Sequence, residues 1–370
     1  MNRPSVIVIG AGIVGCTIAY ELARAGARVQ VLETRAPGQG ATRASAGILA
    51  PFIEGHGSEL LRTLGTRSLS GYDEFIARLR EDGGEVLYRR NGTFELAFSD
   101  ADYARLQELL RLLVEQGVEA RWVDPSPFAE VEPPASPEAK GGLLIPSHGF
   151  VGVTSLTLAA MEAAKKHHAR FRTETGAIRI TSMPNRRVGV QTSRAAWEAD
   201  RVVLAAGSWS SAIEVVGAER IPVKPIRGQL IQLQGAEGAI THVLWGPGGY
   251  LVPWPDGSVL VGSTVEDVGF DEEHTDAAVE QLRAAAVAMV PSLASAEMTS
   301  VRTGLRPKGP DDIPIIGRSR AVAGLIYATA HYRNGVLFAP LTVQLVNELV
   351  FDRDADAALR DLDPARVGKL

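Results

Sequence analysis

The first 33 residues alternate between two short apolar runs and one amphipathic segment. Residues 5–10 (SVIVIG) are almost wholly apolar and β-branched, which is typical of a strand buried on both faces of a parallel sheet. Residues 13–25 place apolar side chains at helical spacing, and residues 28–33 form a second strand-like run. This pattern predicts a βαβ unit at the start of the chain.

The same two periodicities continue along the rest of the chain. Helical spacing predicts helices over residues 59–81, 101–116, 152–168, 276–290 and 341–351. Strand patterns occur at residues 92–98, 177–182, 188–192, 201–205, 229–234, 250–253, 258–263 and 325–328. Segments typical of a nucleotide-binding fold occur at the start, in the middle and at the end of the chain, and β-rich segments separate them. We therefore expect an α/β protein in which a Rossmann-type domain is interleaved with a β-rich α+β domain.

Composition narrows the class of protein. A chain of 370 residues is long enough for two packed regions. The net charge of −5 and the absence of a long basic run disfavour nucleic-acid binding. No apolar run reaches the ~18–20 residues of a membrane span. A single cysteine, Cys16, allows no internal disulfide and no cysteine-rich metal site. We expect a cytoplasmic protein without a metal; the sequence leaves the oligomeric state open, a homo-oligomer included.

Residues 10–15 (GAGIVG) match the dinucleotide fingerprint. Gly10 permits a tight turn after the strand, Gly12 lets the backbone approach a pyrophosphate, and Gly15 lets the helix pack closely. Glu33 ends the second strand at about the spacing expected of a carboxylate that binds a ribose. A glycine fingerprint alone is weak evidence, but strand, helix and carboxylate all accompany it here. The segment is therefore interpreted as a dinucleotide site.

Two later segments indicate a cofactor that extends across the sheet. Residues 201–209 (RVVLAAGSW) form a buried strand that ends in a small-residue turn, and residues 331–335 (HYRNG) stand between a strand and a helix. Either segment alone could simply be a turn. Together with the fingerprint they favour FAD over NAD as the cofactor.

Further segments carry a family resemblance that covers essentially the whole chain. They are residues 41–51 (ATRASAGILAP), 228–229, 250–253 (YLVP), 261–264 (VGST), 304–307 (GLRP), 312–317 (DIPIIG) and 331–340. With the fingerprint, they are similar to the D-amino acid oxidase family of flavoproteins, and within it to the glycine oxidases of bacterial thiamine biosynthesis. The resemblance implies an FAD-binding domain of residues 1–85, 145–222 and 300–370. The substrate domain would comprise residues 86–144 and 223–299.

The resemblance also implies which residues bind the cofactor. Small side chains at 41–48 would let backbone donors reach it, and 331–337 would wrap the flavin. The implied residues are Gly10, Gly12, Ile13, Val14, Gly15, Glu33, Thr34, Ala41, Thr42, Ala46, Gly47, Ile48, Ala177, Ala206, Gly207, Trp209, His331, Tyr332, Arg333, Asn334, Gly335, Val336 and Leu337. Related sarcosine oxidases tether flavin through a cysteine, but Cys16 lies on the first helix, where it is expected to pack. The predicted FAD is therefore non-covalent.

The resemblance assigns catalytic roles to Tyr250, Arg306 and Arg333. Arg306 would bind a substrate carboxylate, because its planar fork suits that group better than lysine does. Without the family match, an arginine in this sequence context would be interpreted as part of a surface ion pair. Tyr250 alone is equally well explained as a buried aromatic. Arg333 would position the carboxylate or polarise the flavin.

Val265 and Trp245 are predicted to line the substrate pocket, with His242 as a further candidate. Val265 is shorter than the residue common in glycine oxidases, so we expect a pocket that accepts a substrate bulkier than glycine. Ala330 replaces a glycine that usually precedes the HYRN run, which we expect to shift the backbone beside the flavin.

The implied reaction is oxidative deamination of glycine, an N-substituted glycine or another small amino acid. A hydride passes from Cα to flavin N5, the imine is hydrolysed, and O2 is reduced to H2O2. The same fold could instead serve a D-amino acid or 2-hydroxy acid dehydrogenase with another electron acceptor. A non-catalytic dinucleotide-binding module is the third reading, and it predicts cofactor binding without any turnover.

Overall fold

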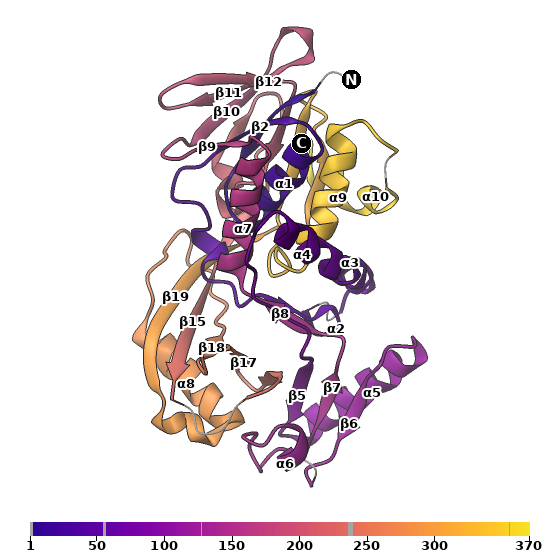
Figure 1. The fold of residues 1–370 in the computed structure, drawn as a ribbon, viewed down its shortest axis with the longest axis vertical. Helices are drawn as coiled ribbons and strands as arrows, with labels where there is room; N and C mark the ends of the chain where they lie inside the picture. The colour runs from indigo at the N-terminus through magenta and orange to yellow at the C-terminus, as the bar shows by residue number, and fades with distance from the viewer. Residues whose placement is uncertain (1–2, 55–56, 127, 236–239, 355) are drawn as a thin grey trace.

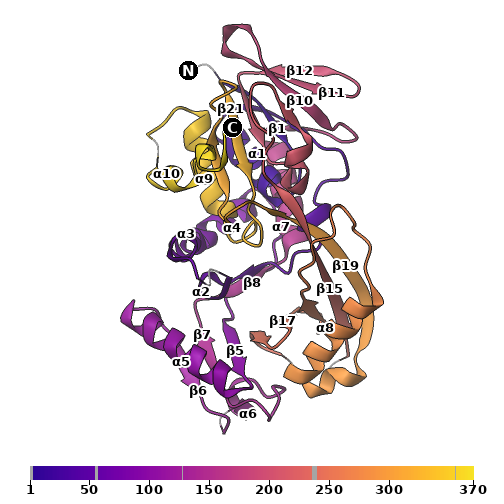
Figure 2. The same ribbon diagram turned by 180° about the vertical axis from the view of Figure 1, so that it is seen from behind.

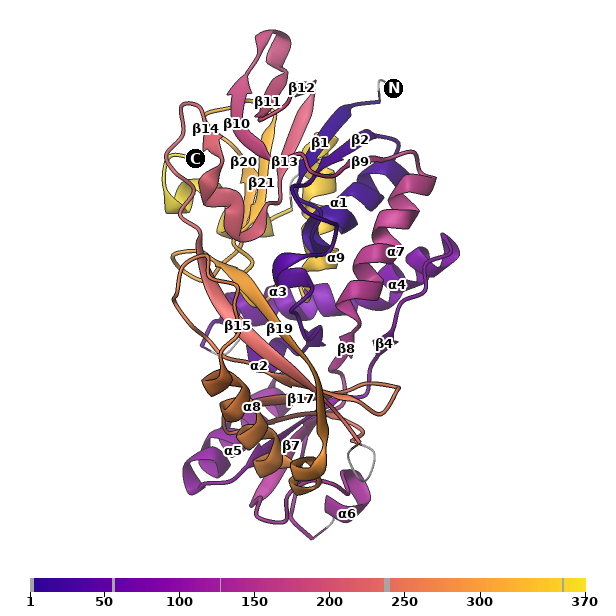
Figure 3. The same ribbon diagram turned by 90° about the vertical axis from the view of Figure 1, so that its left-hand side faces the viewer.

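The computed structural model describes residues 3–54, 57–126, 128–235, 240–354 and 356–370. The chain forms two adjoining parts, each built around its own sheet (Figure 1). Strands β1 and β2 with helix α1 belong to one part, and the long strands β15 and β19 lead from it into the other (Figure 3).

The first part is built on a six-stranded sheet. Its strands, in spatial order, are β20 (Ile315–Arg318), β21 (Leu325–Thr329), β13 (Arg201–Leu204), β1 (Ser5–Ile9), β2 (Arg28–Leu32) and β9 (Arg170–Arg172). All neighbouring pairs are parallel except β20 with β21. A buried parallel sheet explains why β1 and β13 are almost continuously apolar. The predicted Rossmann-type sheet is confirmed.

Helices cover one face of this sheet and a second sheet covers the other. Helix α1 (Ile13–Arg24) packs between α7 (Val153–Lys166) and α9 (Ala339–Val350). The opposite face packs against a four-stranded sheet of β12 (Ala196–Ala199), β11 (Val188–Thr192), β10 (Ala177–Ser182) and β14 (Glu214–Val215). This layering buries both faces of the six-stranded sheet, as parallel sheets require.

The second part is built on an eight-stranded sheet. Its order is β19 (Glu297–Lys308), β15 (Lys224–Gln234), β18 (Val259–Gly262), β17 (Gly249–Pro253), β16 (Val243–Gly246), β5 (Thr93–Ala97), β7 (Gly141–Ile145) and β6 (Arg121–Val123). Helix α8 (Asp276–Met289) packs on β15–β18, and α5 (Asp100–Glu115) packs on β5 and β7 (Figure 2). The β-rich second region predicted from the sequence is therefore present.

Further strands and helices complete the fold. They are β3 (Ile48–Leu49), β8 (Gly149–Val151) and β4 (Tyr88–Arg89), which form a three-stranded sheet, and the helices α2 (Pro51–Glu54), α3 (Glu59–Ser70), α4 (Tyr72–Glu81), α6 (Phe128–Val131) and α10 (Ala358–Leu362). Short 3-10 helices lie at Gly40–Thr42, Pro184–Arg186, Gly207–Ala212, Pro291–Ser295 and Pro364–Val367. In the part of the chain that the structure describes, no helix has the length and apolar character needed to cross a membrane.

Two sequence predictions about elements need correction. The helix predicted over residues 59–81 is two helices, because the chain turns at Gly71 between α3 and α4. Strand β19 was not predicted at all, and it places residues 300–308 in the eight-stranded sheet. The predicted domain boundary at residue 300 therefore falls inside a strand. The remaining division into an FAD-binding and a substrate domain stays a prediction.

Two buried histidines make stability depend on pH. Burial lowers the pKa of His148 to about 3 and that of His331 to about 4, from an ordinary value of 6.5. The unfolded chain therefore binds these protons near pH 6.5, before the folded protein does. Their contribution is complete above pH 6.5 and is lost as the pH falls towards 4. We expect the free energy of unfolding to fall by about 2 kcal/mol per histidine between pH 7 and 5.

Urea unfolding at both pH values measures this loss, and His148→Asn isolates one of the two contributions. The hydroxyl of Thr93 lies 2.8 Å from His148 Nδ1 and retains an amide partner in the variant. The variant should lose about 2 kcal/mol less than the parent between pH 7 and 5. Equal losses in the two proteins would show that His148 does not titrate on unfolding.

Candidate functional site

A cavity extends from the end of β2 to the eight-stranded sheet. Most residues predicted to bind a cofactor or substrate line it. They are Gly10, Gly12, Ile13, Val14, Glu33, Thr34, Ala41, Thr42, Ala46, Gly47, Ile48, Ala177, Ala206, Gly207, Trp209, Tyr250, Arg306, His331, Tyr332, Arg333, Gly335 and Val336. Segments far apart in the sequence thus meet at one site.

The turn between β1 and α1 has the geometry of a phosphate-binding loop. Gly10 has φ +104°, a left-handed conformation that glycine adopts without strain. A Cβ on Gly15 would lie 1.9 Å from the carbonyl oxygen of Gly10, so only glycine allows this approach of helix to strand. Gly15 therefore acts behind the loop and does not line the cavity. The N-terminus of α1 presents its positive end to the cavity.

Glu33 and Thr42 fix the two sides of this loop. The Glu33 carboxylate accepts hydrogen bonds from the backbone N–H groups of Ala11 (2.7 Å) and Arg35 (2.8 Å). Its remaining lone pairs are suited to a ribose hydroxyl. The Thr42 hydroxyl accepts a hydrogen bond from the Ile13 N–H at 3.0 Å. The 41–48 segment is thereby held against the start of α1.

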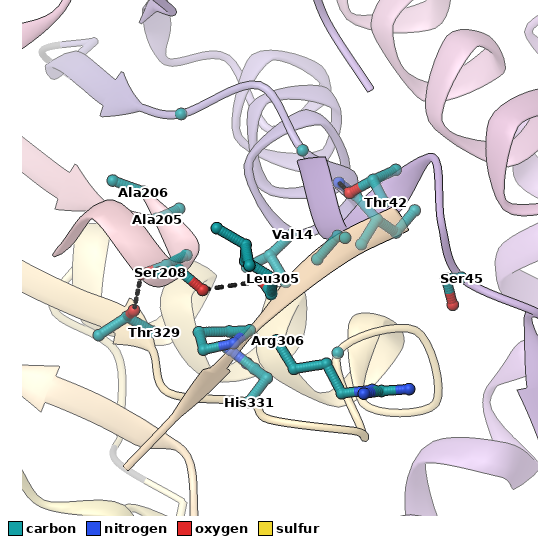
Figure 4. Close-up of a pocket in the computed structure, with 18 of the residues that line it drawn as sticks. Val14, Thr42, Ser45, Ala205, Ala206, Ser208, Leu305, Arg306, Thr329 and His331 are labelled. Atoms are coloured by element: carbon teal, nitrogen blue, oxygen red, sulfur yellow. Dashed lines mark hydrogen bonds between the residues drawn. The ribbon is translucent and has the colours of Figure 1, made fainter. Parts of the chain in front are cut away.

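The turn after β13 links the cavity to the second sheet. Ser208 donates a hydrogen bond to the Leu305 carbonyl at 2.7 Å, and Thr329 donates one to the Gly207 carbonyl at 3.3 Å. Figure 4 shows both contacts, with the Arg306 side chain extending away from them. Because Leu305 precedes Arg306 on β19, the Ser208 contact fixes this part of β19 relative to the first sheet.

In the segment after β21, some residues line the cavity and others are buried in the core. His331 lines the cavity, and its Nε2 lies 3.0 Å from the Thr342 hydroxyl. Asn334 and Leu337, both predicted to contact the cofactor, are buried and do not line the cavity. Ala330 has φ +59°, so the alanine adopts the left-handed conformation that favours glycine.

Arg306 lies at the cavity end nearest the eight-stranded sheet. Its Nη1 donates to the carbonyls of Thr264 (3.0 Å) and Arg227 (3.4 Å), and its Nη2 donates to the Ser263 hydroxyl (2.7 Å). All three acceptors are neutral. Burial lowers the pKa of Arg306, and no described carboxylate lies within ion-pair distance of it. The site thus holds a desolvated cation that an anionic ligand would complete.

Gly228 on β15 makes room for this guanidinium. A Cβ at Gly228 would lie 2.2–2.3 Å from the Arg306 guanidinium atoms. Gly228→Ala should therefore displace Arg306 and raise KM about tenfold, with little change in cofactor content. Steady-state kinetics and the flavin absorbance of the purified variant measure the two effects. Ser263→Ala, which removes one hydrogen bond without a clash, should cause a smaller rise. An unchanged KM in Gly228→Ala would mean that Arg306 does not bind substrate.

Tyr250 on β17 lies close to Arg306 in the same cavity. It is 6% exposed, and its phenol lies over Gly262, where a Cβ would come within 2.4 Å of the hydroxyl. Burial raises the pKa of Tyr250, so the phenol stays neutral and can donate a hydrogen bond. The arrangement gives a ligand carboxylate two neighbouring donors, from Arg306 and Tyr250.

Arg333 is engaged within the protein. Its Nε lies 3.0 Å from Glu54 Oε2, and the two side chains are 32% and 12% exposed. The Glu54 carboxylate raises the pKa of Arg333. Glu54 lines the cavity but was not predicted from the sequence. No local sequence pattern singles out Glu54, because only the tertiary fold brings α2 next to Arg333.

Three predicted pocket residues lie elsewhere. Val265 is 55% exposed and does not line the cavity, whereas Ser263 does line it and the Thr264 hydroxyl accepts a hydrogen bond from the Gln229 N–H at 2.9 Å. Trp245 does not line the cavity but packs behind Tyr250, with ring centroids 5.0 Å apart. His242 contacts Glu132 at 2.7 Å on the far side of the second sheet. Val265 therefore gives no reason to expect an enlarged pocket.

The cavity includes further residues that were not individually predicted as site residues. Several belong to segments that the sequence singled out, and the others have no distinctive motif. They are Arg35, Gln39, Ala44, Ser45, Glu54, Gly176, Ala205, Ser208, Ala212, Ile213, Gly228, Ser263, Gly304, Leu305, Pro307, Ala328 and Thr329. The described residues include no cluster of three or more His, Cys, Asp or Glu side chains suited to a metal ion.

Comparison with known proteins identifies the family to which the chain belongs. Residues 5–349 match the family described as DAO, FAD dependent oxidoreductase. The chain belongs to this FAD-dependent oxidoreductase family. The predicted cofactor, FAD, and the predicted D-amino acid oxidase-like fold are thereby confirmed.

Relatives of this FAD-dependent oxidoreductase match it along its length. Glycine oxidase of Pseudomonas aeruginosa is 33% identical over 94% of this chain and 95% of its own. The crystal structure of glycine oxidase from Geobacillus kaustophilus has a TM-score of 0.93 at 28% identity, covering 99% of both chains. Iminodiacetate oxidase from a Chelativorans species has a TM-score of 0.87 at 27% identity, covering 97% of this chain and 98% of its own.

A longer relative contains a second region. The bifunctional protein ThiO/ThiG of Trichormus variabilis is 30% identical over 98% of this chain, which spans 55% of that protein's length. Its bifunctional activity therefore belongs to a protein about twice as long.

The glycines of the FAD-dependent oxidoreductase fit a bound FAD. A Cβ on Gly207 would meet no protein atom within 4 Å, and one on Gly335 would meet only His331 Cβ, at 3.5 Å. Both residues line the cavity, so these missing side chains leave space inside it. Cys16 is buried in α1, outside the cavity lining, and donates to the Ala11 carbonyl. The dinucleotide would therefore rest on the α1 N-terminus, Glu33 and the 41–48 segment.

Proposed function

We propose that this enzyme oxidises the amine of a small amino acid, either glycine or an N-substituted glycine. The observation that carries the proposal is Arg306, a desolvated cation with only neutral partners beside the neutral phenol of Tyr250. A planar guanidinium binds a carboxylate through two parallel hydrogen bonds. A small α-amino acid bound there would present its Cα towards the middle of the cavity.

The residues around Arg306 define what the protein contributes. Arg306 and Tyr250 would hold the carboxylate and so orient the α-carbon, and burial would strengthen both hydrogen bonds. Bound FAD supplies the hydride acceptor. His331 stays neutral near pH 7 because burial lowers its pKa to about 4, so it adds no charge to the site. No acid–base side chain is required if the amine binds in its neutral form.

The proposed reaction balances with two substrates and water. The amino acid loses two electrons and two protons to give an imine. O2 takes up the two electrons and two protons to give H2O2. Water then cleaves the imine to an amine or ammonia and a 2-oxo acid. The relatives named for glycine and iminodiacetate oxidation support an amine donor. Since Val265 lies outside the cavity, the choice between glycine and an N-substituted glycine rests on these relatives alone.

Oxygen consumption by the purified holoenzyme tests this function. Glycine, sarcosine, N-ethylglycine, D-alanine and glycolate would each be offered with and without a dye acceptor. The proposal expects O2 uptake and H2O2 release with glycine or an N-substituted glycine. Turnover only with a dye would favour the dehydrogenase alternative. Turnover only with glycolate would overturn the amine assignment.

A further inference from the structure

Three charged side chains line the cavity near the substrate end: Glu54, Arg306 and Arg333. The other charged side chains that line it, Glu33 and Arg35, belong to the opposite end, at β2. These three charges of the described lining therefore decide which anions the substrate end accepts.

The two arginines are in different electrostatic states. Arg333 forms an ion pair with Glu54, whose side chain is 12% exposed and therefore largely shielded from water. Arg306 contacts two carbonyls and one hydroxyl but no described carboxylate. One positive charge thus remains uncompensated at Arg306, while Arg333 is neutralised.

Glu54 is held in position by its helix. The preceding residues Phe52 and Ile53 are 6% and 4% exposed, and the Glu54 N–H donates to the Ala50 carbonyl at 2.9 Å. These contacts anchor α2 and hold the Glu54 carboxylate beside Arg333. Releasing Arg333 to another anion would leave a shielded Glu54 unpaired, which is costly.

We propose that Glu54 determines specificity by occupying Arg333, so that the site accepts substrates with one carboxylate and disfavours dicarboxylates. This inference rests on the proposed function for the location of the substrate. A second carboxylate near Arg333 would face the negative charge of Glu54. Removing that charge frees Arg333 and converts the pocket into one that can bind two carboxylates.

Binding of inert ligands tests the charge argument without turnover. Thiodiacetate and (methylthio)acetate contain no amine, carry two and one carboxylates, and would be titrated calorimetrically into the holoenzyme. Glu54→Gln should lower the Kd of thiodiacetate, relative to the Kd of (methylthio)acetate, by about tenfold or more. Glu54→Asp retains the charge and should leave the ratio near that of the parent. An equal ratio in parent and Glu54→Gln would overturn the proposal.

Turnover measurements provide a second test of the proposal. Iminodiacetate and its monoamide are nearly the same size and differ in one negative charge. The parent should prefer the monoamide in kcat/KM, and Glu54→Gln should shift this ratio towards iminodiacetate by about tenfold. An unshifted ratio would contradict the role of Glu54. If neither compound is oxidised, glycine and sarcosine are not oxidised either, and the binding ratio still changes, the proposed reaction fails and the charge role of Glu54 stands.

Discussion

Arg306→Ala is expected to raise KM for the amino acid substrate about a hundredfold or more. The substitution removes a desolvated guanidinium whose described partners are neutral, and therefore the charge that would bind the carboxylate. Truncating one partner of a buried hydrogen-bonded charge pair typically costs about 2–5 kcal/mol, which corresponds to this loss of affinity. Steady-state kinetics of the holoenzyme, with flavin content measured in parallel, give the result.

Arg306→Lys is the matched control for this prediction. It keeps the positive charge but loses the planar fork, so KM should rise about tenfold, less than in the alanine variant. Flavin content should stay near that of the parent in both variants. A KM unchanged in Arg306→Ala would remove Arg306 from the substrate site and would leave the carboxylate without a binding group.

Gly12→Val is expected to abolish FAD retention. Gly12 lines the cavity between Gly10 and the start of α1, and its φ of −75° and ψ of −175° are extended angles that any residue adopts. The effect would therefore come from occupied space rather than from backbone strain. A branched side chain there would fill the region where the pyrophosphate approaches the helix. The Kd for FAD should rise at least about a hundredfold, as measured by flavin fluorescence titration of the apoprotein.

Gly12→Ala gives the graded control. Its Cβ would lie 3.0 Å from the Thr42 hydroxyl, a tight contact that a small movement relieves. The alanine variant should therefore bind FAD more weakly than the parent but more tightly than the valine variant. Circular dichroism of the apoproteins checks that the fold is retained. Full flavin content in purified Gly12→Val would contradict the placement of the cofactor on this loop.

The nucleotide half of the site could be predicted from the sequence because its determinants are local. Residues 5–33 carry the strand, the glycine turn, the helix and Glu33 in one continuous pattern, and the structure assembles them into β1, α1 and β2. Each residue acts through its own stretch of backbone, so spacing alone specifies the geometry. The 41–48 segment was interpretable only through the family resemblance, because small residues without a periodic pattern also form ordinary linkers.

The substrate half depends on contacts that no local pattern records. Arg306 stands on β19, a strand that the sequence did not predict because its first half is largely exposed and rich in polar residues. Glu54 reaches Arg333 across 279 residues of sequence, and its ion pair exists only in the folded chain. For Val265 a local pattern was present but misleading. Its position after a family motif suggested the pocket, but in the folded chain its side chain is 55% exposed and lies outside the cavity lining.

Anaerobic mixing of the holoenzyme with matched substrates tests the central claim most directly. Glycine, sarcosine, dimethylamine and glycolate would be added separately. Dimethylamine lacks the carboxylate of sarcosine, and glycolate has a hydroxyl in place of the amine of glycine. Glycine is the primary-amine reference. The visible absorbance of the flavin reports oxidation of the ligand without any dependence on O2. We predict bleaching with glycine or sarcosine and none with dimethylamine or glycolate. Bleaching by glycolate alone, or equally by dimethylamine, would contradict a site built around Arg306 for small amino acids.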